Sequence, residues 1–261
     1  MIPKIIHYCW FGNNPIPSEQ QRYIEEWKQL MPDFQFKCWS EKDIDIASIP
    51  FAKQAYDAGK LAFVADYTRI YALYHEGGIY MDTDVKVLSS LEPYLKYGVF
   101  TSYEYNTSRD QMHLLNKMLT PDGHRKNSSL MEKIPGNGLL SALIGSEKGH
   151  PFIKDCLDFY NQSNNFNTIY EQKFTIPTVL ALHAEKYGFV YIDKEQNLAG
   201  NIKIYDSGVF SDFHNTTSRS VAIHYCKGSW VEKNLFNRIK SKLYRIHWLR
   251  KLVQLVMPKQ R

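Results

Sequence analysis

The stretch "GGIYMDTDV", Gly77 to Val85, contains three structural signals in succession. A Gly-Gly pair ends the helical pattern before it, and the apolar run that follows is typical of a buried strand. Two aspartates, Asp82 and Asp84, come directly after that run. Because burying an unpaired carboxylate is costly, such groups are usually neutralised, paired or bound to a metal. The rest of the chain indicates which explanation applies here.

The segments around this stretch alternate between strand and helix patterns. Helical patterns occupy 19–31, capped by Ser18, and 51–58, 60–78, 151–162 and 176–188, while strand patterns occupy 4–10, 34–40, 79–88, 189–193, 202–206 and 220–226. Such alternation predicts an α/β fold with a mostly parallel sheet, in which ligands gather at the carboxyl ends of strands. Asp82 and Asp84 come at such an end. The polar segment 94–143 gives no clear assignment.

The composition is that of an ordinary globular protein. The chain has 261 residues, of which 44% are hydrophobic and 14% aromatic, enough for one large or two small domains. We find neither the long apolar segment of a secretion signal nor a run of about 18 apolar residues that would span a membrane. The four cysteines form no C-x-x-C pair, so we expect reduced thiols in a cytoplasmic protein.

The positive charge is concentrated at the C-terminus. Nine of the 32 basic residues and none of the 27 acidic ones lie in 233–261, although the whole chain has a net charge of only +5. Leu235, Ile239, Leu243, Ile246, Leu249 and Val253 form an apolar helical stripe in this tail. The pattern fits either an amphipathic helix lying on anionic lipid or a helix docked on the body of the protein. No motif supports nucleic-acid binding.

The spacing of the two aspartates suits a divalent cation. Two carboxylates two residues apart on a strand point to the same side, and at a strand-to-loop corner they can share one Mn²⁺ or Mg²⁺. Such an ion would neutralise a diphosphate leaving group. A bare D-x-D is common on exposed loops, but here an apolar strand, a Gly-Gly turn and a helix with embedded charge precede it.

Two further groups of charged residues accompany this motif. Asp66 and Arg69 are neighbours at i, i+3 on the predicted helix, either as a structural ion pair or as a pair that binds sugar and phosphate oxygens. In "AIHYCKGSW", His224 is either a structural histidine or a metal ligand, and Lys227 could meet a phosphate.

Together these segments resemble the D-x-D glycosyltransferase family, which includes bacterial capsular-polysaccharide and lipopolysaccharide sugar transferases and the initiating mannosyltransferases of yeast. The segments that match are "FVADYTRIYALYHEGGIYMDTDV", the opening "IPKIIHYCWFG", "W…MPDFQFKCW" and the closing "IHYCKGSW". The catalytic domain of the large glucosylating toxins is more distantly similar. The resemblance spans residues 2–230. It implies a GT-A nucleotide-sugar transferase domain over 1–232, followed by the basic amphipathic helical tail over 233–261.

The resemblance also implies roles for individual residues. Asp84 would be the main metal ligand, Asp82 would contact the ribose, the donor sugar and the metal, and His224 would be a further metal ligand. Donor-binding roles would fall to Asp66, Arg69, Tyr80, Asn137, Trp10 (against the nucleobase), and Ser229 and Trp230 (over the diphosphate). Many family members carry an acid or a second histidine in the last motif, whereas this chain has His224-Tyr225, which leaves the number of protein ligands open.

The family further implies that the sugar keeps its anomeric configuration. No carboxylate nucleophile stands out in the sequence, so we favour a front-face mechanism in which the departing phosphate assists the incoming hydroxyl. The cation, Lys227 and Arg69 would stabilise the charge that develops on the diphosphate. Asp82, Asp84, Arg69 and Lys227 are therefore the predicted catalytic residues.

Three other interpretations compete with this one. In a haloacid-dehalogenase-type phosphohydrolase, Asp82 would be the nucleophile and Asp84 the general acid, but that motif belongs near an N-terminus and Lys86 occupies a position that it assigns to another residue type. A membrane-associated carbohydrate-binding or scaffold protein without turnover would keep the fold alone. A toxin-like transferase would modify a host protein.

We therefore expect a metal-dependent hexosyltransferase on the cytoplasmic face of the cell membrane, held there by its tail. It would transfer a hexose or N-acetylhexosamine from a nucleotide sugar to a glycan or lipid-linked acceptor in surface polysaccharide synthesis. UDP is the favoured carrier.

Overall fold

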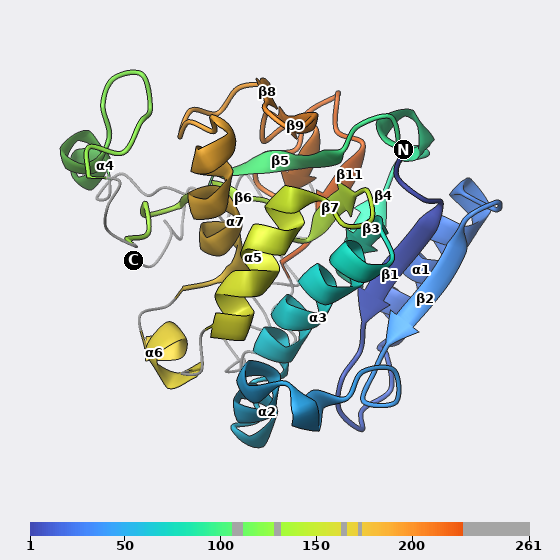
Figure 1. Cartoon of the computed structure of the whole chain (residues 1–261). Coiled ribbons are helices and arrows are strands. Elements are labelled where there is room, and N and C mark those ends of the chain that lie inside the picture. Colours follow the sequence, from blue (N-terminus) through green and yellow to red (C-terminus); the bar gives the residue numbers. More distant parts are fainter. Residues whose placement is uncertain (106–111, 128–131, 163–165, 172–173, 227–261) are drawn as a thin grey trace, which may run out of the picture. The chain divides into compact units, whose positions relative to one another are not determined.

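The computed structural model describes residues 1–105, 112–127, 132–162, 166–171 and 174–226 (Figure 1). The strands are β1 Ile5–Cys9, β2 Gln35–Trp39, β3 Gly78–Met81, β4 Val85–Val87, β5 Val99–Tyr105, β6 Asn137–Leu139, β7 Leu143–Ser146, β8 Gln196–Leu198, β9 Ile202–Tyr205, β10 Phe210–Asp212 and β11 Ala222–His224. The helices are α1 Ser18–Leu30, α2 Pro50–Asp57, α3 Leu61–His75, α4 Met112–Met118, α5 Pro151–Gln162, α6 Phe166–Glu171 and α7 Ile176–Ala184. The α/β class is confirmed.

The central sheet is mixed, so the prediction of a mostly parallel sheet is wrong. In the described residues its strand order is β2-β1-β3-β7-β5-β9-β8, with β6 paired to β5. Strand β1 runs parallel to β2 and β3, and β5 runs parallel to β9. Strand β7 enters between β3 and β5 antiparallel to both. A separate three-stranded sheet has the order β10-β11-β4.

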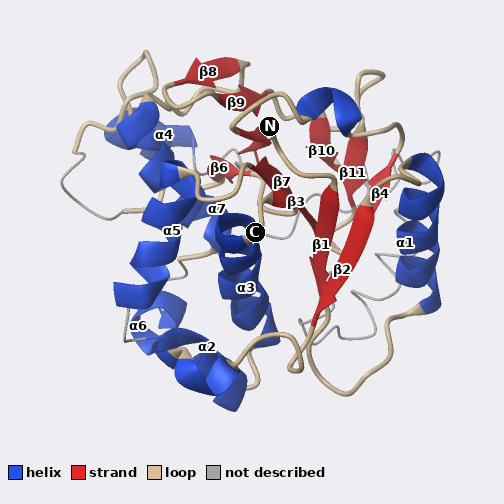
Figure 2. Ribbon diagram, turned by 45° about the vertical axis from the view of Figure 1, so that its right-hand side comes forward, coloured by secondary structure: helices blue, strands red, loops and turns tan. Residues whose placement is uncertain are grey.

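Apolar residues pack on both faces of the central sheet. Figure 2 shows α2, α3 and α5 on one side of β1 and α1 on the other. One hydrophobic cluster contains residues of α2, α3, α5 and α7, and a second contains residues of α1, β4 and β10. In β3, Tyr80 belongs to the first cluster, whereas Ile79 and Met81 belong to the second. This strand is therefore buried on both faces, as its continuous apolar sequence requires.

The Gly-Gly pair ends α3 and starts β3, as its position predicts. Gly77 and Gly78 both have positive φ angles, 69° and 108°. A Cβ atom on Gly78 would lie 2.6 Å from the carbonyl oxygen of Ile5. His7 accepts a hydrogen bond at Nδ1 from Trp39, 3.1 Å away, so its Nε2 donates to the carbonyl of Gly77 at 2.8 Å. The turn must be this tight because β3 pairs directly with β1.

Three local predictions differ from the structure. Helix α1 begins at Ser18 and no side chain caps it, so Ser18 is not the cap. The predicted strand at 79–88 is two strands, β3 and β4, with a turn between them. Residues 189–193 form no strand, because both hydrogen-bonding groups of the Val190 backbone bond to the side chain of Gln196. Strands β7, β8 and β10 were not predicted.

The predicted tail domain, 233–261, lies outside the described residues. Within the described residues, no helix is long and apolar enough to cross a bilayer.

Candidate active site

The D-x-D motif occupies a turn that four hydrogen bonds hold in place. The N–H of Asp82 bonds to the carbonyl of Ala142 at 2.9 Å, and the N–H of Val85 closes the turn onto the carbonyl of Asp82 at 3.0 Å. The indole N–H of Trp27, from α1, donates to the carbonyl of Val85 at 3.0 Å. The N–H of Tyr225 donates to the carbonyl of Asp84 at 3.1 Å. The two carboxylates are therefore fixed relative to the central sheet, to α1 and to β11.

Strand pairing brings His224 to the motif from a distant part of the sequence. His224 lies opposite Val85 in the antiparallel pair of β11 and β4, which brings it next to the D-x-D turn. Its Nε2 is 3.2 Å from Oδ1 of Asp84 and 3.8 Å from Oδ2 of Asp82. Ligand atoms of all three residues lie within 4.8 Å of one another. We refer to Asp82, Asp84 and His224 as the triad.

The donor set of the triad fits a divalent cation. Two carboxylates and an imidazole are ligands that Mn²⁺ accepts, and Mg²⁺ also prefers the carboxylate oxygens. Asp84 and His224 are mostly buried, with side chains 11% and 19% exposed, while the Asp82 side chain is 27% exposed. The site therefore opens on the Asp82 side, where a substrate phosphate can complete the ligand set.

A buried ion-pair network fixes Asp82. Nη2 of Arg69 lies 3.2 Å from Asp82 and 3.3 Å from Asp66, and Nη1 donates to the carbonyl of Ser141 at 2.6 Å. The hydroxyl of Tyr80, two residues earlier on the same side of β3, donates to Asp82 at 3.0 Å. The guanidinium also lies 4.3 Å from the centroid of the Tyr80 ring. One Asp82 oxygen is thus held by Arg69 and Tyr80, while the other faces His224.

The two charges inside this network respond differently to burial. Burial raises the pKa of the Asp66 carboxyl to about 7, although Arg69 opposes the shift. Burial would lower the pKa of Arg69, but Asp82 and Asp66 hold it above its ordinary value. Arg69 therefore stays charged beneath the site.

Two of the remaining predicted residues, Trp10 and Asn137, have other hydrogen-bond partners. Trp10 follows β1, and its indole N–H donates to the carbonyl of Asn14 at 2.6 Å. Asn137 is buried in β6, where its side-chain oxygen accepts a hydrogen bond from Tyr103 at 2.5 Å and its amide donates to Pro135 at 2.8 Å. Lys227, Ser229 and Trp230 lie outside the described residues, so their roles stay predictions.

One acidic residue at the site was missed in the sequence. Glu104, near the end of β5, is half-buried and lies within electrostatic range of His224, Asp212, Asp82 and Arg69. Burial raises the pKa of its carboxyl to about 7; His224 opposes the shift, and Asp212 and Asp82 add to it. Glu104 belongs to the segment 94–143 that gave no clear assignment, and the only local signal was a polar residue between two tyrosines.

The fold is that of a GT-A glycosyltransferase. The solved structure described as the PaToxG glycosyltransferase matches with a TM-score of 0.50 and 17% identity, over 71% of this chain and 69% of that one. The match concerns the architecture alone.

Sequence comparisons place the chain more closely. The family model "Glycosyltransferase sugar-binding region containing DXD motif" matches residues 17–101, which include α3 and the D-x-D turn. An inositol phosphoceramide mannosyltransferase of Schizosaccharomyces pombe is 28% identical over 156 residues, 58% of this chain and 35% of the relative. An uncharacterised glycosyltransferase of Acanthamoeba polyphaga mimivirus is 28% identical over 179 residues, 65% of this chain and 70% of the relative. The chain is thus similar to DXD-motif glycosyltransferases over the region that contains α3 and the D-x-D turn, and it spans about a third of the length of the S. pombe mannosyltransferase.

Proposed function

We propose that the protein is a retaining, metal-dependent glycosyltransferase that moves a hexose or N-acetylhexosamine from a nucleotide sugar to a glycan or lipid-linked oligosaccharide. The convergence of Asp82, Asp84 and His224 from two distant strands carries this proposal. Carboxylates this close repel one another unless a cation or a proton lies between them. A divalent ion at the triad also provides what a diphosphate leaving group needs.

The triad and the residues around it have different roles in the proposed reaction. When bound, Mn²⁺ or Mg²⁺ supplies a Lewis acid that neutralises the diphosphate of the donor. Asp84 and His224, the more buried members of the triad, would hold the ion. Arg69 and Tyr80 orient Asp82 toward the open side, so that its free oxygen reaches the ion or the donor.

The transfer step that we propose takes place on one face of the donor sugar. The acceptor's hydroxyl oxygen forms a bond to the anomeric carbon while the bond from that carbon to the diphosphate oxygen breaks. The hydroxyl proton passes to the departing phosphate oxygen. Arg69, charged and buried beneath Asp82, contributes a fixed positive charge where negative charge develops, and Lys227 would add a second.

The relatives guide the choice of substrates. UDP-sugars remain the favoured donors, and surface polysaccharide synthesis is the process in which we propose that the protein acts. The name of the S. pombe relative specifies a mannosyl group and a lipid acceptor for that protein, so GDP-mannose belongs among the donors to be tested. We propose that the basic tail, 233–261, holds the protein on an anionic membrane surface at the cytoplasmic face, close to a lipid-linked acceptor.

Nucleotide release from a panel of donors tests this function. UDP-glucose, UDP-galactose, UDP-N-acetylglucosamine and GDP-mannose are each incubated with the protein and Mn²⁺. We expect release from at least one donor, its loss in chelator, and a decrease of about 100-fold or more in Asp84→Ala without unfolding. Asp57→Ala, at the end of α2, is the control for removal of an exposed carboxylate. Release that persists in chelator would reject metal dependence.

A further inference from the structure

We propose that Glu104 binds a hydroxyl group of the transferred sugar and so helps to select the donor. The inference rests on the proposed function, because it assumes that the diphosphate of a nucleotide sugar binds at the triad. It adds a contact between the sugar and a residue of β5.

The direction of the Glu104 side chain follows from its neighbours on β5. Side chains two residues apart on a strand share a face, so Glu104 lies on the same face as Ser102. Ser102 Oγ accepts a hydrogen bond from the N–H of Phe210, the first residue of β10, at 3.0 Å. Thr101 and Tyr103 use the other face, where their hydroxyls bond to Leu140 and Asn137. Glu104 therefore points toward the sheet that contains β10 and β11.

The end of that sheet is where His224 lies. Two residues beyond Phe210 on β10 is Asp212, which is paired with His224 of β11. Glu104 is thus opposite the strand ends that contain Asp212 and His224, in agreement with its electrostatic interaction with both residues. One residue further along β5, the carbonyl of Tyr105 accepts a hydrogen bond from the side chain of Asn215 at 3.0 Å. Hydrogen bonds on both sides of Glu104 therefore fix the backbone that positions it.

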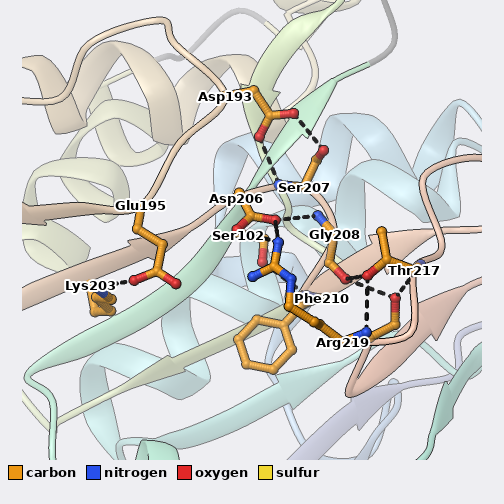
Figure 3. A network of polar contacts seen from close by, with 11 residues as sticks. Ser102, Asp193, Glu195, Lys203, Asp206, Ser207, Gly208, Phe210, Thr217 and Arg219 are labelled. Carbon is orange, nitrogen blue, oxygen red and sulfur yellow. Dashed lines mark hydrogen bonds and ion pairs between the residues drawn. The ribbon is translucent and has the colours of Figure 1, made fainter.

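A polar network holds β10 in this register. Figure 3 shows Asp206 bonded to the backbone of Gly208 at 3.0 Å and to Arg219 at 3.1 Å, with Ser207 bonded to Asp193 at 2.6 Å. These contacts pin the loop that leads from β9 into β10. Figure 3 also draws Phe210 and Ser102, whose hydrogen bond joins β10 to β5. The position of Glu104 relative to the triad is therefore built into the fold.

The carboxylate of Glu104 has no protein partner of its own among the described residues. No hydrogen bond or ion pair there involves the side chain of Glu104, whose charge is repelled by Asp212 and Asp82 and attracted by His224 and Arg69. Asp212, in contrast, accepts hydrogen bonds from the backbone N–H groups of His214 and Asn215 at 2.7 and 2.8 Å. An unpaired, half-buried carboxylate destabilises the protein. A ligand that donates hydrogen bonds would remove this cost.

A sugar attached to the diphosphate meets this requirement. Its anomeric carbon is bonded to a phosphate oxygen, so the ring must lie next to the triad. Arg69 and Asp66 of α3 border one side of the triad, and Glu104 of β5 borders another. Sugar hydroxyls donate hydrogen bonds, and a carboxylate is a strong acceptor for them. The ligand class is thus a nucleotide sugar with a free hydroxyl directed at β5.

Calorimetric binding of nucleotides and nucleotide sugars in Mn²⁺ tests the proposal without turnover. The probes are UDP and GDP, and the four nucleotide sugars of the donor panel. We expect Glu104→Gln to bind the bare nucleotide within about twofold of the wild type, and to bind the preferred nucleotide sugar about tenfold more weakly. Glu104→Ala should show the same pattern with a larger loss. Glu171→Gln, an exposed position on α6, is the matched control.

The outcomes separate this proposal from the proposed function. Unchanged affinity of Glu104→Gln for the nucleotide sugar, or an equal loss for the sugar and the bare nucleotide, would overturn the assignment of Glu104 alone. The Asp84→Asn substitution should weaken binding of the bare nucleotide as well. If the wild type binds neither UDP nor GDP in Mn²⁺, the proposed function fails and the Glu104 proposal fails with it.

Discussion

At the scale of single residues, the carboxylates near the site differ in how their charge is balanced. Asp66 and Asp82 share the guanidinium of Arg69, and Asp82 also receives the hydroxyl of Tyr80. Glu104 has no such partner among the described residues, although it lies in the same electrostatic field. The difference follows from position, because Arg69 projects from α3 and Glu104 lies on β5. The free energy of unfolding should therefore depend on the charge of Glu104, and the Glu104→Gln variant isolates that dependence.

We predict that the Glu104→Gln variant changes the pH dependence of unfolding. The folded-state pKa of Glu104 is raised to about 7, so between its ordinary value of 4.5 and about 7 the folded protein holds a proton that the unfolded chain has released. Wild-type stability should thus fall across this range relative to the variant, by on the order of 2 kcal/mol. Chemical unfolding of both proteins in chelator, at several pH values, measures the difference.

The two proteins should have nearly equal pH slopes below about pH 4, where Glu104 is protonated in both the folded and unfolded states. A constant difference between pH 4 and 8 would contradict the assigned environment of Glu104. Glu171→Gln should track the wild type throughout.

At the scale of elements, the geometry of the site depends on the turn between α3 and β3. We predict that Gly78→Ala destabilises the protein by about 3 kcal/mol, because the new Cβ would collide with the Ile5 carbonyl and the residue has a positive φ. Gly59→Ala, which also has a positive φ but open space around it, should cost about 1 kcal/mol. Thermal or denaturant unfolding of the two variants compares their free energies of unfolding. Gly59→Ala reports backbone strain alone, and Gly78→Ala reports strain together with the collision. Equal losses would mean that β3 can move away from β1.

The sequence predicts elements where one local signal dominates. Helices α5 and α7 follow from apolar spacing, and Gly188 ends the short 3₁₀ turn that comes after α7. Strand β1 follows from a short apolar run and β2 from alternating residues. Residues 189–193 have the composition of a strand, but Gln196 takes the hydrogen-bonding groups of Val190. That competition depends on a side chain six residues away, which strand propensity does not register.

The same distinction separates the site residues. Asp82, Asp84 and His224 were predicted because they belong to short motifs, and the structure places them together. Glu104 has no motif. Its position is set by contacts of β5 with Phe210 and Asn215, more than a hundred residues later in the chain. Nothing in the local sequence around Glu104 reports such contacts.

At the scale of the whole molecule, the charge distribution connects the transferase domain to its proposed location. Nine basic residues and no acidic residue lie in 233–261. We predict that the full chain sediments with vesicles containing anionic lipid, and that protein truncated after Glu232 loses most of this binding. High salt should weaken the binding of the full chain, and neutral vesicles are the control. Equal sedimentation of the truncated protein would reject the tail as the membrane contact.

The metal site is tested most directly by a calorimetric titration of Mn²⁺ into the wild type and into Asp84→Asn, with UDP or GDP present. We predict that the wild type binds a single ion and that the variant binds it at least about tenfold more weakly, with both proteins folded. Equal affinity of the two proteins for Mn²⁺, or no binding by the wild type, would contradict the claim that Asp82, Asp84 and His224 form a metal site.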